Sequence, residues 1–495
     1  MGDAFSRRLA VVLLASLSFL AIPGLASQTP LRVELQLEPP HLDPTLTAAS
    51  TVAEALHLNV FQGLTRIDRH GEVQAALATR WEVSEDGLVY RFALRSDVRF
   101  HHGKTFDSAV AAYSLRRLLE VENANPQRHL FQAIRHVEEV GTHELRIELA
   151  QPDALLPFRL ALSAAVIVHP DTVHTNRSHP VGTGPYRFVD WERNEGIRLR
   201  AFEAYWGEPP AIREALFTFT PNRVELENLL SEGAIDLYPD ASSLTAHMPL
   251  MQRADYVIQD GLSEGEVLLA MNHGRTLFQD LRVRRALSHA IDREALLTIY
   301  PSIDPPLIGS HFSPRHPAYV DLSQRYPYDP ERARKLLAEA GFSGGTPIAL
   351  TVPPTQYAER SSLYIASDLE AVGFEVELQR VSWGEWLRQV FTERDYDMTV
   401  IAHVEPMDID IYARDDYYFN YHSETFRELW SRIEAQQDPA ERHRLLAEAQ
   451  RHLAEEAVHV FLFLKPQQAI RKSNLQGVWD DAPIPAVVLE ELYWE

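Results

Sequence analysis

A regular apolar repeat runs through Phe278-Gln-Asp-Leu-Arg-Val-Arg-Arg-Ala-Leu-Ser-His-Ala-Ile-Asp-Arg-Glu294. Its apolar residues recur at i, i+3, i+4, i+7 and i+8, which places them along one side of an α-helix: Val283, Ala286, Leu287, Ala290 and Ile291. Asp280 stands just before the repeat, where an Asp side chain can accept hydrogen bonds from the first backbone amides of a helix. The segment therefore predicts a capped helix with one buried face, and Arg284 and its basic neighbours are expected to point largely away from that face.

Alternating helices and strands follow this helix. Asp329-Pro330 provides an N-cap and a first helical residue, and Gly341 suits the position just after the last turn. The pattern then predicts a strand, a helix and a second strand over 348–352, 362–372 and 374–378. A buried apolar strand ends at Ala402. This is a βαβαβ unit, and open α/β sheets bind ligands beyond the carboxyl ends of their strands, so the loop after Ala402 is expected to contact a ligand.

Two strand patterns mark the N-terminal half. Leu31 to Leu37 alternates apolar and polar residues, as a strand with one buried face does. The residues from Glu38 to Pro44 include three prolines, which fix φ and lack a backbone donor, so this segment is expected to be a pocket-lining loop. Further along, two alternating runs meet at Asp86-Gly87, a pair that favours the tight turn of a β-hairpin.

The N-terminus has the pattern of a secretory signal peptide. Arg7-Arg8 precedes an apolar run from Leu9 to Leu20, and Pro23 and the small residues up to Ala26 suit a cleavage site. A membrane anchor is the alternative, but a span needs about 20 apolar residues and Pro23 interrupts this run. Residues 1–26 are therefore expected to be removed, which leaves a soluble, exported protein.

Composition excludes several classes of protein. The 495 residues are 45% hydrophobic and 24% charged, which is typical of a globular chain of two or three domains. The chain has no cysteine, so disulfides and a lipid attached through Cys are excluded. A net charge of −23 disfavours nucleic acid and anionic membranes as partners. The chain contains neither Gly-x-Ser-x-Gly nor His-Glu-x-x-His, so we do not expect a hydrolase or another enzyme.

Two local motifs offer chemistry that their context does not support. Adjacent imidazoles at His101-His102 are good donors for a transition metal, but neighbours on a strand point to opposite faces, so we expect a turn and no metal. The segment Val181-Gly-Thr-Gly-Pro-Tyr186 is glycine-rich. Its spacing fits neither the P-loop nor the dinucleotide fingerprint, so it is not expected to bind phosphate.

Several sequence motifs resemble those of one protein family. Met271-Asn272-His273 followed by the helix from Phe278, the hairpin around Asp86-Gly87, and Gly182-Thr-Gly-Pro-Tyr186 continuing to Ala204-Tyr205-Trp206-Gly207 are similar to solute-binding proteins of the peptide and nickel ABC importers. The resemblance spans about residues 31 to 480. It implies an α/β fold of the class II periplasmic-binding-protein type, a bilobal clamshell with an extra inserted domain.

The resemblance also implies a division of the chain. Domain I combines residues 31–49, 171–265 and 466–495, domain II is inserted as residues 50–170, and domain III covers residues 266–465.

The function that this family implies is ligand capture. A monomer in the periplasm would hold a peptide or another small molecule between its lobes and deliver it to ABC permease subunits in the membrane. No cofactor, metal or nucleic acid is expected. Nickel chelates, bile acids and sugars remain open as ligands, and so does a sensory role with a different partner.

The ligand-binding residues that we expect are Glu38, Phe61, Tyr186, Asn272, Trp383, His403, Glu405, Asp408 and Tyr412. Relatives usually carry Gly-Trp and then an Asp for the ligand ammonium group, whereas here Ala402-His403 occupies the Gly-Trp place and Pro406 falls near the Asp place. Glu405 or Asp408 can substitute through a charge-assisted hydrogen bond, and the alternative is that both are solvated loop residues. Tyr186 is expected either in the cleft or in the core.

Overall fold

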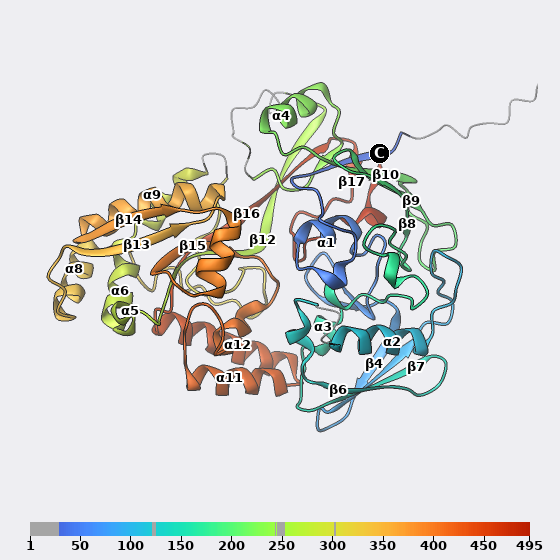
Figure 1. Ribbon diagram of the computed structural model, residues 1–495, viewed down its shortest axis with the longest axis horizontal. Helices are drawn as coiled ribbons and strands as arrows, with labels where there is room; N and C mark the ends of the chain where they lie inside the picture. The colour runs from blue at the N-terminus through green and yellow to red at the C-terminus, as the bar shows by residue number, and fades with distance from the viewer. Residues whose placement is uncertain (1–28, 121–124, 243, 245–252, 301–302) are drawn as a thin grey trace, which may run out of the picture.

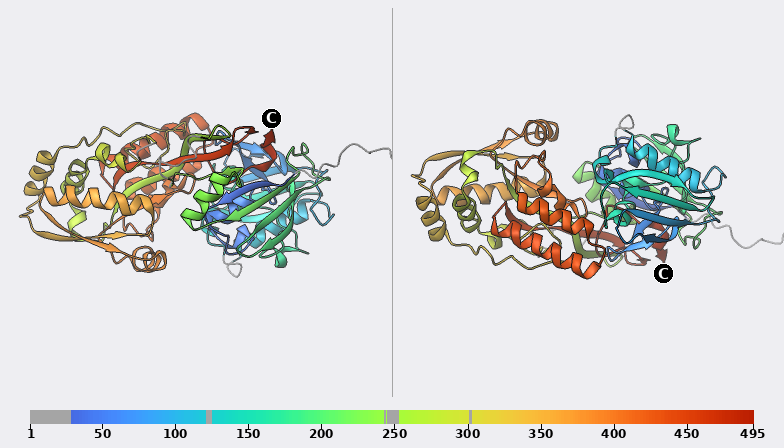
Figure 2. Two further views of the ribbon diagram at one scale, coloured as in Figure 1. Left: turned by 90° about the horizontal axis from the view of Figure 1, so that it is seen from above. Right: turned by 90° about the horizontal axis from the view of Figure 1, so that it is seen from below.

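Two lobes joined by long strands make up the molecule (Figure 1). The computed structural model describes residues 29–120, 125–242, 244, 253–300 and 303–495, so the predicted signal peptide lies outside the described residues. Strands β12 (Tyr256–Met271) and β16 (Val460–Lys472) run antiparallel from one lobe to the other. We call the part that holds β1 (Leu31–Leu35) lobe 1 and the part that holds β15 (Met398–His403) lobe 2. Figure 2 shows the lobes side by side along the long axis, with the C-terminus in lobe 1.

One ten-stranded sheet passes through both lobes. Its order is β14-β13-β15-β12-β16-β11-β1-β10-β9-β8. The strands not yet given are β8 (Tyr186–Glu192), β9 (Gly196–Ala201), β10 (Glu214–Phe219), β11 (Leu237–Tyr238), β13 (Thr346–Val352) and β14 (Phe374–Arg380). The pairing of β12 with β16 breaks between Leu262 and Glu266, so a bulge interrupts the connection at the junction of the lobes.

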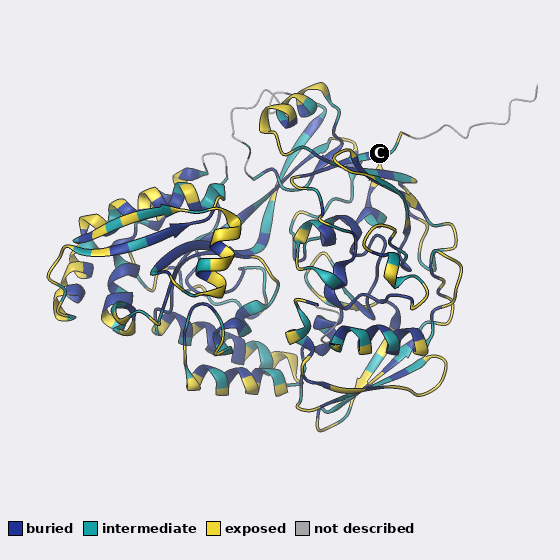
Figure 3. Cartoon of the chain, in the orientation of Figure 1, coloured by how far each residue is buried: buried dark blue, intermediate teal, exposed yellow. Residues whose placement is uncertain are grey.

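Lobe 2 is the predicted α/β unit. Strands β13, β14 and β15 are parallel, and successive residues of β12 point to the two faces of the sheet: Leu269 packs with α6, α8 and α9, and Leu268 packs with α11 and α12. The helices of this lobe are α5 (Thr276–Gln279), α6 (Leu281–Ala290), α7 (Arg293–Leu296), η7 (Leu297–Ile299), α8 (Pro330–Glu339), α9 (Gln356–Ala371), α10 (Trp383–Trp386), η8 (Leu387–Thr392), η9 (Asp408–Ala413), α11 (Glu424–Ala435) and α12 (Pro439–Glu455). Figure 3 shows the inner strands of this sheet largely buried, with exposed positions on the edge strand β14.

The structure confirms the central part of the helix predicted from the apolar repeat as α6. Asp280 caps α6 by accepting a hydrogen bond from the Arg282 amide at 2.8 Å, and the whole apolar stripe is buried. The segment is nevertheless split, because Asp292 caps a second short helix, α7. Arg284 lies outside the apolar stripe, yet its side chain is buried and donates to the carbonyl oxygens of Phe278 and Glu456. Those carbonyls satisfy a guanidinium whose partners the helical pattern alone does not reveal.

Lobe 1 contains the predicted hairpin. Strands β4 (Ala78–Val83) and β5 (Val89–Leu94) pair antiparallel in a four-stranded sheet of order β4-β5-β7-β6. The remaining elements are η1 (Pro44–Leu46), α1 (Ser50–Leu56), β2 (Thr65–Ile67), β3 (Val73–Ala75), α2 (Ser108–Leu119), η3 (Arg128–Phe131), β6 (Ile134–Glu139), β7 (Glu144–Leu149), α3 (Leu156–Arg159), η4 (Ser163–Ala165), η5 (Val173–Thr175), α4 (Arg223–Glu232), β17 (Leu475–Gln476), η10 (Leu489–Glu491) and β18 (Tyr493–Trp494). Among the described helices, none is long and apolar enough to cross a membrane.

Two hydrophobic cores of lobe 1 share the segment expected to form the inserted domain. Helix α1 and Phe61 pack around β1, as do Val166 and Val168, whereas Leu64, Leu77 and many residues between them and Ile167 pack with the four-stranded sheet. Both ends of the segment thus contact the core of the ten-stranded sheet.

Candidate functional site

Asp408 lies at the centre of a buried polar cluster, just beyond the carboxyl end of β15. Its Oδ1 is 2.7 Å from His311 Nε2, and its Oδ2 is 3.2 Å from His403 Nδ1. Burial by itself would raise the pKa of Asp408, but the two histidines outweigh it and hold that pKa below its ordinary value. Both oxygens of the carboxylate are therefore already engaged by imidazoles.

Two tyrosines hold the outer nitrogens of these histidines. The hydroxyl of Tyr412 is 3.2 Å from His311 Nδ1, and the hydroxyl of Tyr418 is 3.0 Å from His403 Nε2. Both tyrosines are almost completely buried. Each imidazole is thus fixed at its outer nitrogen and presents its inner nitrogen to Asp408.

Glu266 completes the cluster from the bulge end of β12. The residue is only 4% exposed, and its Oε2 accepts no hydrogen bond from any described residue. That oxygen is 3.9 Å from His311 Nε2. Burial, reinforced by Asp408 and Glu264, raises the pKa of Glu266 well above its ordinary value. An unpartnered buried carboxyl oxygen is costly, so this atom points to a missing partner.

An ion-pair chain joins this cluster to lobe 1. Arg315 Nη1 is 3.0 Å from Glu264 Oε1, and its Nε is 2.7 Å from Asp481 Oδ2. Asp481 also accepts a hydrogen bond from the Leu262 amide at 2.8 Å. Burial raises the pKa of Glu264 to about 7 despite Arg315. The β12 bulge is therefore held at Leu262 by Asp481 and at Glu264 by Arg315.

A second charged group lies at the other side of the same bulge. Lys465 Nζ is 3.0 Å from Asp240 Oδ2, and the lysine side chain is 24% exposed. A Cβ placed on Gly265 would lie 3.0 Å from Lys465 Cβ and 3.3 Å from Val404 Cγ1, so the lysine and the loop after β15 flank one glycine. Glu405, next to Val404, is exposed. The junction thus holds a lysine paired with Asp240 on one side and, on the other, a loop that carries an exposed glutamate.

Trp383 lies on the surface of lobe 2. Its ring is 44% exposed and stacks on Trp386 with centroids 5.2 Å apart. Trp386 is buried and donates from Nε1 to Thr399 Oγ1 at 3.0 Å. Trp383 therefore offers an accessible ring face, and its place in a ligand site stays a prediction.

Four of the expected ligand-binding residues lie away from the Asp408 cluster. Tyr186 is fully buried, and its hydroxyl donates to the Ile212 carbonyl at 2.8 Å, so it belongs to the core of lobe 1. Phe61 is buried in the same core. Asn272 donates to the carbonyls of Arg394 and Tyr396, which fixes the start of β15. Glu38 accepts from Trp191 Nε1 at 3.0 Å, which ties the loop after β1 to β8. In this arrangement the polar side-chain atoms of Tyr186, Asn272 and Glu38 form hydrogen bonds within the protein.

Sequence reasoning missed Glu266 and His311. The sequence did contain a sign of Glu266, because this Glu lies inside an otherwise apolar strand. A buried Glu is rare unless it has a partner, so its position there indicates a partner or a function. His311 had none: it lies in an irregular segment with no periodicity, 97 residues from its partner Asp408.

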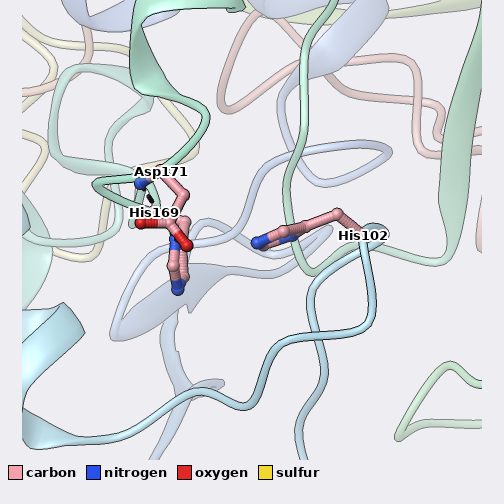
Figure 4. A group of neighbouring side chains, drawn as sticks. All are labelled: His102, His169 and Asp171. Atoms are coloured by element: carbon pink, nitrogen blue, oxygen red, sulfur yellow. Dashed lines mark hydrogen bonds and ion pairs between the residues drawn. The ribbon is translucent and has the colours of Figure 1, made fainter.

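A separate histidine pair lies in lobe 1. His101 Nε2 is 3.0 Å from the Gly184 carbonyl, while His102 turns to His169, with ring centroids 4.6 Å apart. The two neighbours therefore serve different partners, as expected for a turn. Figure 4 shows His102 beside His169 and Asp171. Because His169 Nδ1 accepts the Asp171 backbone amide at 3.1 Å, the nitrogen nearest the Asp171 carboxylate is already engaged.

Comparison with known proteins places this geometry in a family. Residues 72–425 match the family model described as bacterial extracellular solute-binding proteins, family 5 Middle. The chain is 30% identical to the glutathione-binding protein GsiB of Salmonella typhimurium over 311 residues, which cover 61% of this chain and 60% of that protein. It is 27% identical to the dipeptide-binding protein of Escherichia coli over 390 residues, 71% of each.

Solved structures show the same fold. The periplasmic binding protein DppA of Helicobacter pylori, in complex with the peptide STSA, superposes with a TM-score of 0.81 at 22% identity, covering 94% of this chain and 98% of that one. NikZ of Campylobacter jejuni, in complex with Ni(L-His), gives a TM-score of 0.79 at 20% identity, covering 94% and 99%. The predicted class II bilobal α/β fold is therefore confirmed. With the family model matching most of its length, the chain belongs to the bacterial extracellular solute-binding proteins of family 5.

Proposed function

We propose that this chain is the periplasmic substrate-binding component of an ABC importer. It captures a peptide or peptide-like solute between its lobes and delivers it to the membrane permease. Family membership supports this role, as do the names of relatives that bind glutathione and dipeptides. The proposal includes a cleaved signal peptide, a monomeric state, and domains I, II and III with the boundaries expected from the sequence.

Closure of the two lobes is the proposed working motion. Strands β12 and β16 are the long connections, and the bulge between Leu262 and Glu266 gives one of them a point of bending. A solute that contacts both lobes at once stabilises the closed arrangement by its differential affinity for it. The permease would then recognise the closed form.

The charged side chains near the β12 bulge suggest which kind of ligand the protein binds. Glu405 is exposed and lies beside Asp408, while Lys465 flanks the same glycine from β16. A solute with an ammonium and a carboxylate, as a short peptide has, matches one anionic and one cationic anchor at short range. We propose that Glu405 and Asp408 face the ammonium end, that Lys465 faces the carboxylate end, and that Trp383, His403 and Tyr412 shape the surrounding wall.

Calorimetry of the mature chain with di- and tripeptides and with glutathione tests this function. We expect at least one of them to bind, and Glu405→Gln to weaken that binding about tenfold because a charge-assisted hydrogen bond is lost. The matched control is Glu393→Gln, an acid of lobe 2 that already pairs with Arg388 and should leave affinity unchanged. Absence of binding to every peptide, with no compaction of the scattering curve, would refute the proposal, and native mass spectrometry of the purified protein would then identify another solute.

A further inference from the structure

The Asp408 cluster has more acceptors than its neighbours can satisfy. One ligand atom from each of Glu266, His311 and Asp408 lies within 4.8 Å of the others. Glu264 and Glu405 add two more carboxylates nearby, and the described basic side chain that pairs with them is Arg315, bound to Glu264. Four carboxyl groups therefore gather around one site, an arrangement that favours a bound cation.

We infer that Glu266, His311 and Asp408 form a binding site for a divalent transition-metal ion. The donor set is one imidazole nitrogen and two carboxylates, which suits ions such as Zn²⁺, Co²⁺ and Ni²⁺ better than Mg²⁺ or Ca²⁺. The unpartnered Oε2 of Glu266 gains a partner when an ion lies between it and His311 Nε2. No residue in the described part of the chain donates a hydrogen bond to that oxygen.

The surroundings of the two histidines can accommodate a metal-bound imidazole. A metal-bound imidazole carries its proton on the outer nitrogen and donates it to a neighbouring acceptor. The hydroxyl of Tyr412 is placed to accept from His311 Nδ1, and that of Tyr418 to accept from His403 Nε2. His403 braces the second oxygen of Asp408 and so orients the carboxylate. In the structure His311 Nε2 donates to Asp408, so an ion at this nitrogen displaces that proton, and the Tyr412 hydroxyl can then accept from Nδ1.

Access to the site runs past Asp408. The side chains of His311 and Glu266 are 1% and 6% exposed, whereas that of Asp408 is 11% exposed and borders the exposed Glu405. An ion in the inner triad would engage Asp408, one of the two carboxylates proposed for the ligand ammonium group, and would leave Glu405 to hold that group.

Titration of the chelator-stripped mature chain with ZnCl₂, together with the visible absorption of the Co²⁺ form, tests the site. We expect one ion per chain with His311→Gln and Glu266→Gln each weakening binding by at least about 30-fold, since each removes a ligand. Excess Mg²⁺ should not compete. Glu266→Gln is the variant that keeps the result interpretable, because an amide in place of an unpartnered buried carboxyl should preserve the thermal transition.

Two matched variants control for general effects. Asp410→Asn alters an acid of the same loop that pairs with Arg414, and His422→Gln removes an exposed histidine, so both should bind metal as the unmodified chain does. The inference is overturned if no ion binds at millimolar metal, if binding survives in both Glu266→Gln and His311→Gln, or if His169→Gln alone abolishes it. A chain that binds peptides but no metal overturns this inference and leaves the proposed function intact.

Discussion

Arg159 Nη2 of α3 in lobe 1 lies 2.8 Å from Glu434 Oε1 of α11 in lobe 2. The side chains are 10% and 15% exposed, and the Glu434 carbonyl also accepts the Ala154 amide at 2.6 Å. Asp153 pairs with the same guanidinium, and burial raises the pKa of Asp153 to about 6. The lobes are thus joined at a second place, outside the crossover strands, by a contact that forms only when α3 and α11 lie against each other.

Glu434→Gln should shift the molecule toward an open arrangement. The substitution removes the charge that Arg159 meets across the lobes while Asp153 still satisfies the guanidinium, so the loss falls mainly on closure and not on folding. For a largely buried pair we expect ligand affinity to fall about tenfold, with a larger radius of gyration in the absence of ligand. Calorimetry and small-angle scattering measure the two effects.

Arg432→Gln is the matched control for that experiment. Arg432 lies on the same helix and pairs with Glu448 in the exposed layer between α11 and α12, where an ion pair contributes little. Equal losses of affinity in the two variants would show that Glu434 acts through the stability of α11 rather than through closure.

Gly182→Ala should destabilise lobe 1 severely. A Cβ on Gly182 would lie 1.9 Å from the Val60 carbonyl oxygen, and backbone atoms cannot move aside as a flexible side chain can. We expect a loss of several kcal/mol in the free energy of unfolding, of about 3 kcal/mol or more, from urea denaturation. Gly384→Ala is the control: nothing lies within 4 Å of its Cβ, and it sits in helix α10, where Ala is preferred over Gly. An unchanged Gly182→Ala midpoint would contradict the close approach of these segments.

The local parts of the fold could be predicted from the sequence. The stripe of α6, the cap at Asp280 and the hairpin at Asp86-Gly87 depend on residues a few positions apart, and all three are confirmed. Arg284 could not be predicted, because one of its carbonyl acceptors belongs to Glu456, 172 residues away. A helical pattern says which face is apolar, but not what the polar face meets.

Only the part of the candidate site that follows β15 could be predicted from the sequence. The position of the loop after β15 indicated His403 and Asp408, and these two do lie together. Their role in holding a ligand stays a prediction. His311 and Glu266 join them from segments far apart in the chain, and Asn272, expected near the ligand, is used to hold the backbone of Arg394 and Tyr396. Residue type and spacing do not reveal which of several polar side chains the tertiary fold satisfies internally.

Trp383→Ala and Trp386→Ala should separate a surface role from a core role. Trp383 is 44% exposed, so its removal should cost less than about 1.5 kcal/mol of stability, mainly the stacking on Trp386. Trp386 is buried and hydrogen-bonded to Thr399, so its removal should cost about 3 to 5 kcal/mol. Urea denaturation measures both. If Trp383 shapes the ligand wall as proposed, Trp383→Ala also weakens peptide binding while the fold remains.

Acid should destabilise the junction between the Gly182 loop and the inserted segment through His101. The ring accepts the Gly182 amide at Nδ1 (3.3 Å) and donates from Nε2 to the Gly184 carbonyl (3.0 Å), so it is neutral in the folded chain. Burial lowers the pKa of His101 to about 4, below the ordinary value of 6.5. Between these values the unfolded chain binds the proton more readily, so the stabilisation is complete above pH 6.5 and is lost as pH falls toward 4.

The contribution of His101 amounts to about 3 kcal/mol at most over that pH range. Other buried histidines titrate in the same direction, so the measurement is the difference in unfolding free energy between the unmodified chain and His101→Gln, followed from pH 7 to pH 4. We expect His101→Gln to flatten the acid slope, whereas His70→Gln, in an exposed turn, should leave it unchanged. A slope that His101→Gln does not alter would mean that the ring is already protonated in the folded chain, and the hydrogen bond from the Gly182 amide would then be lost.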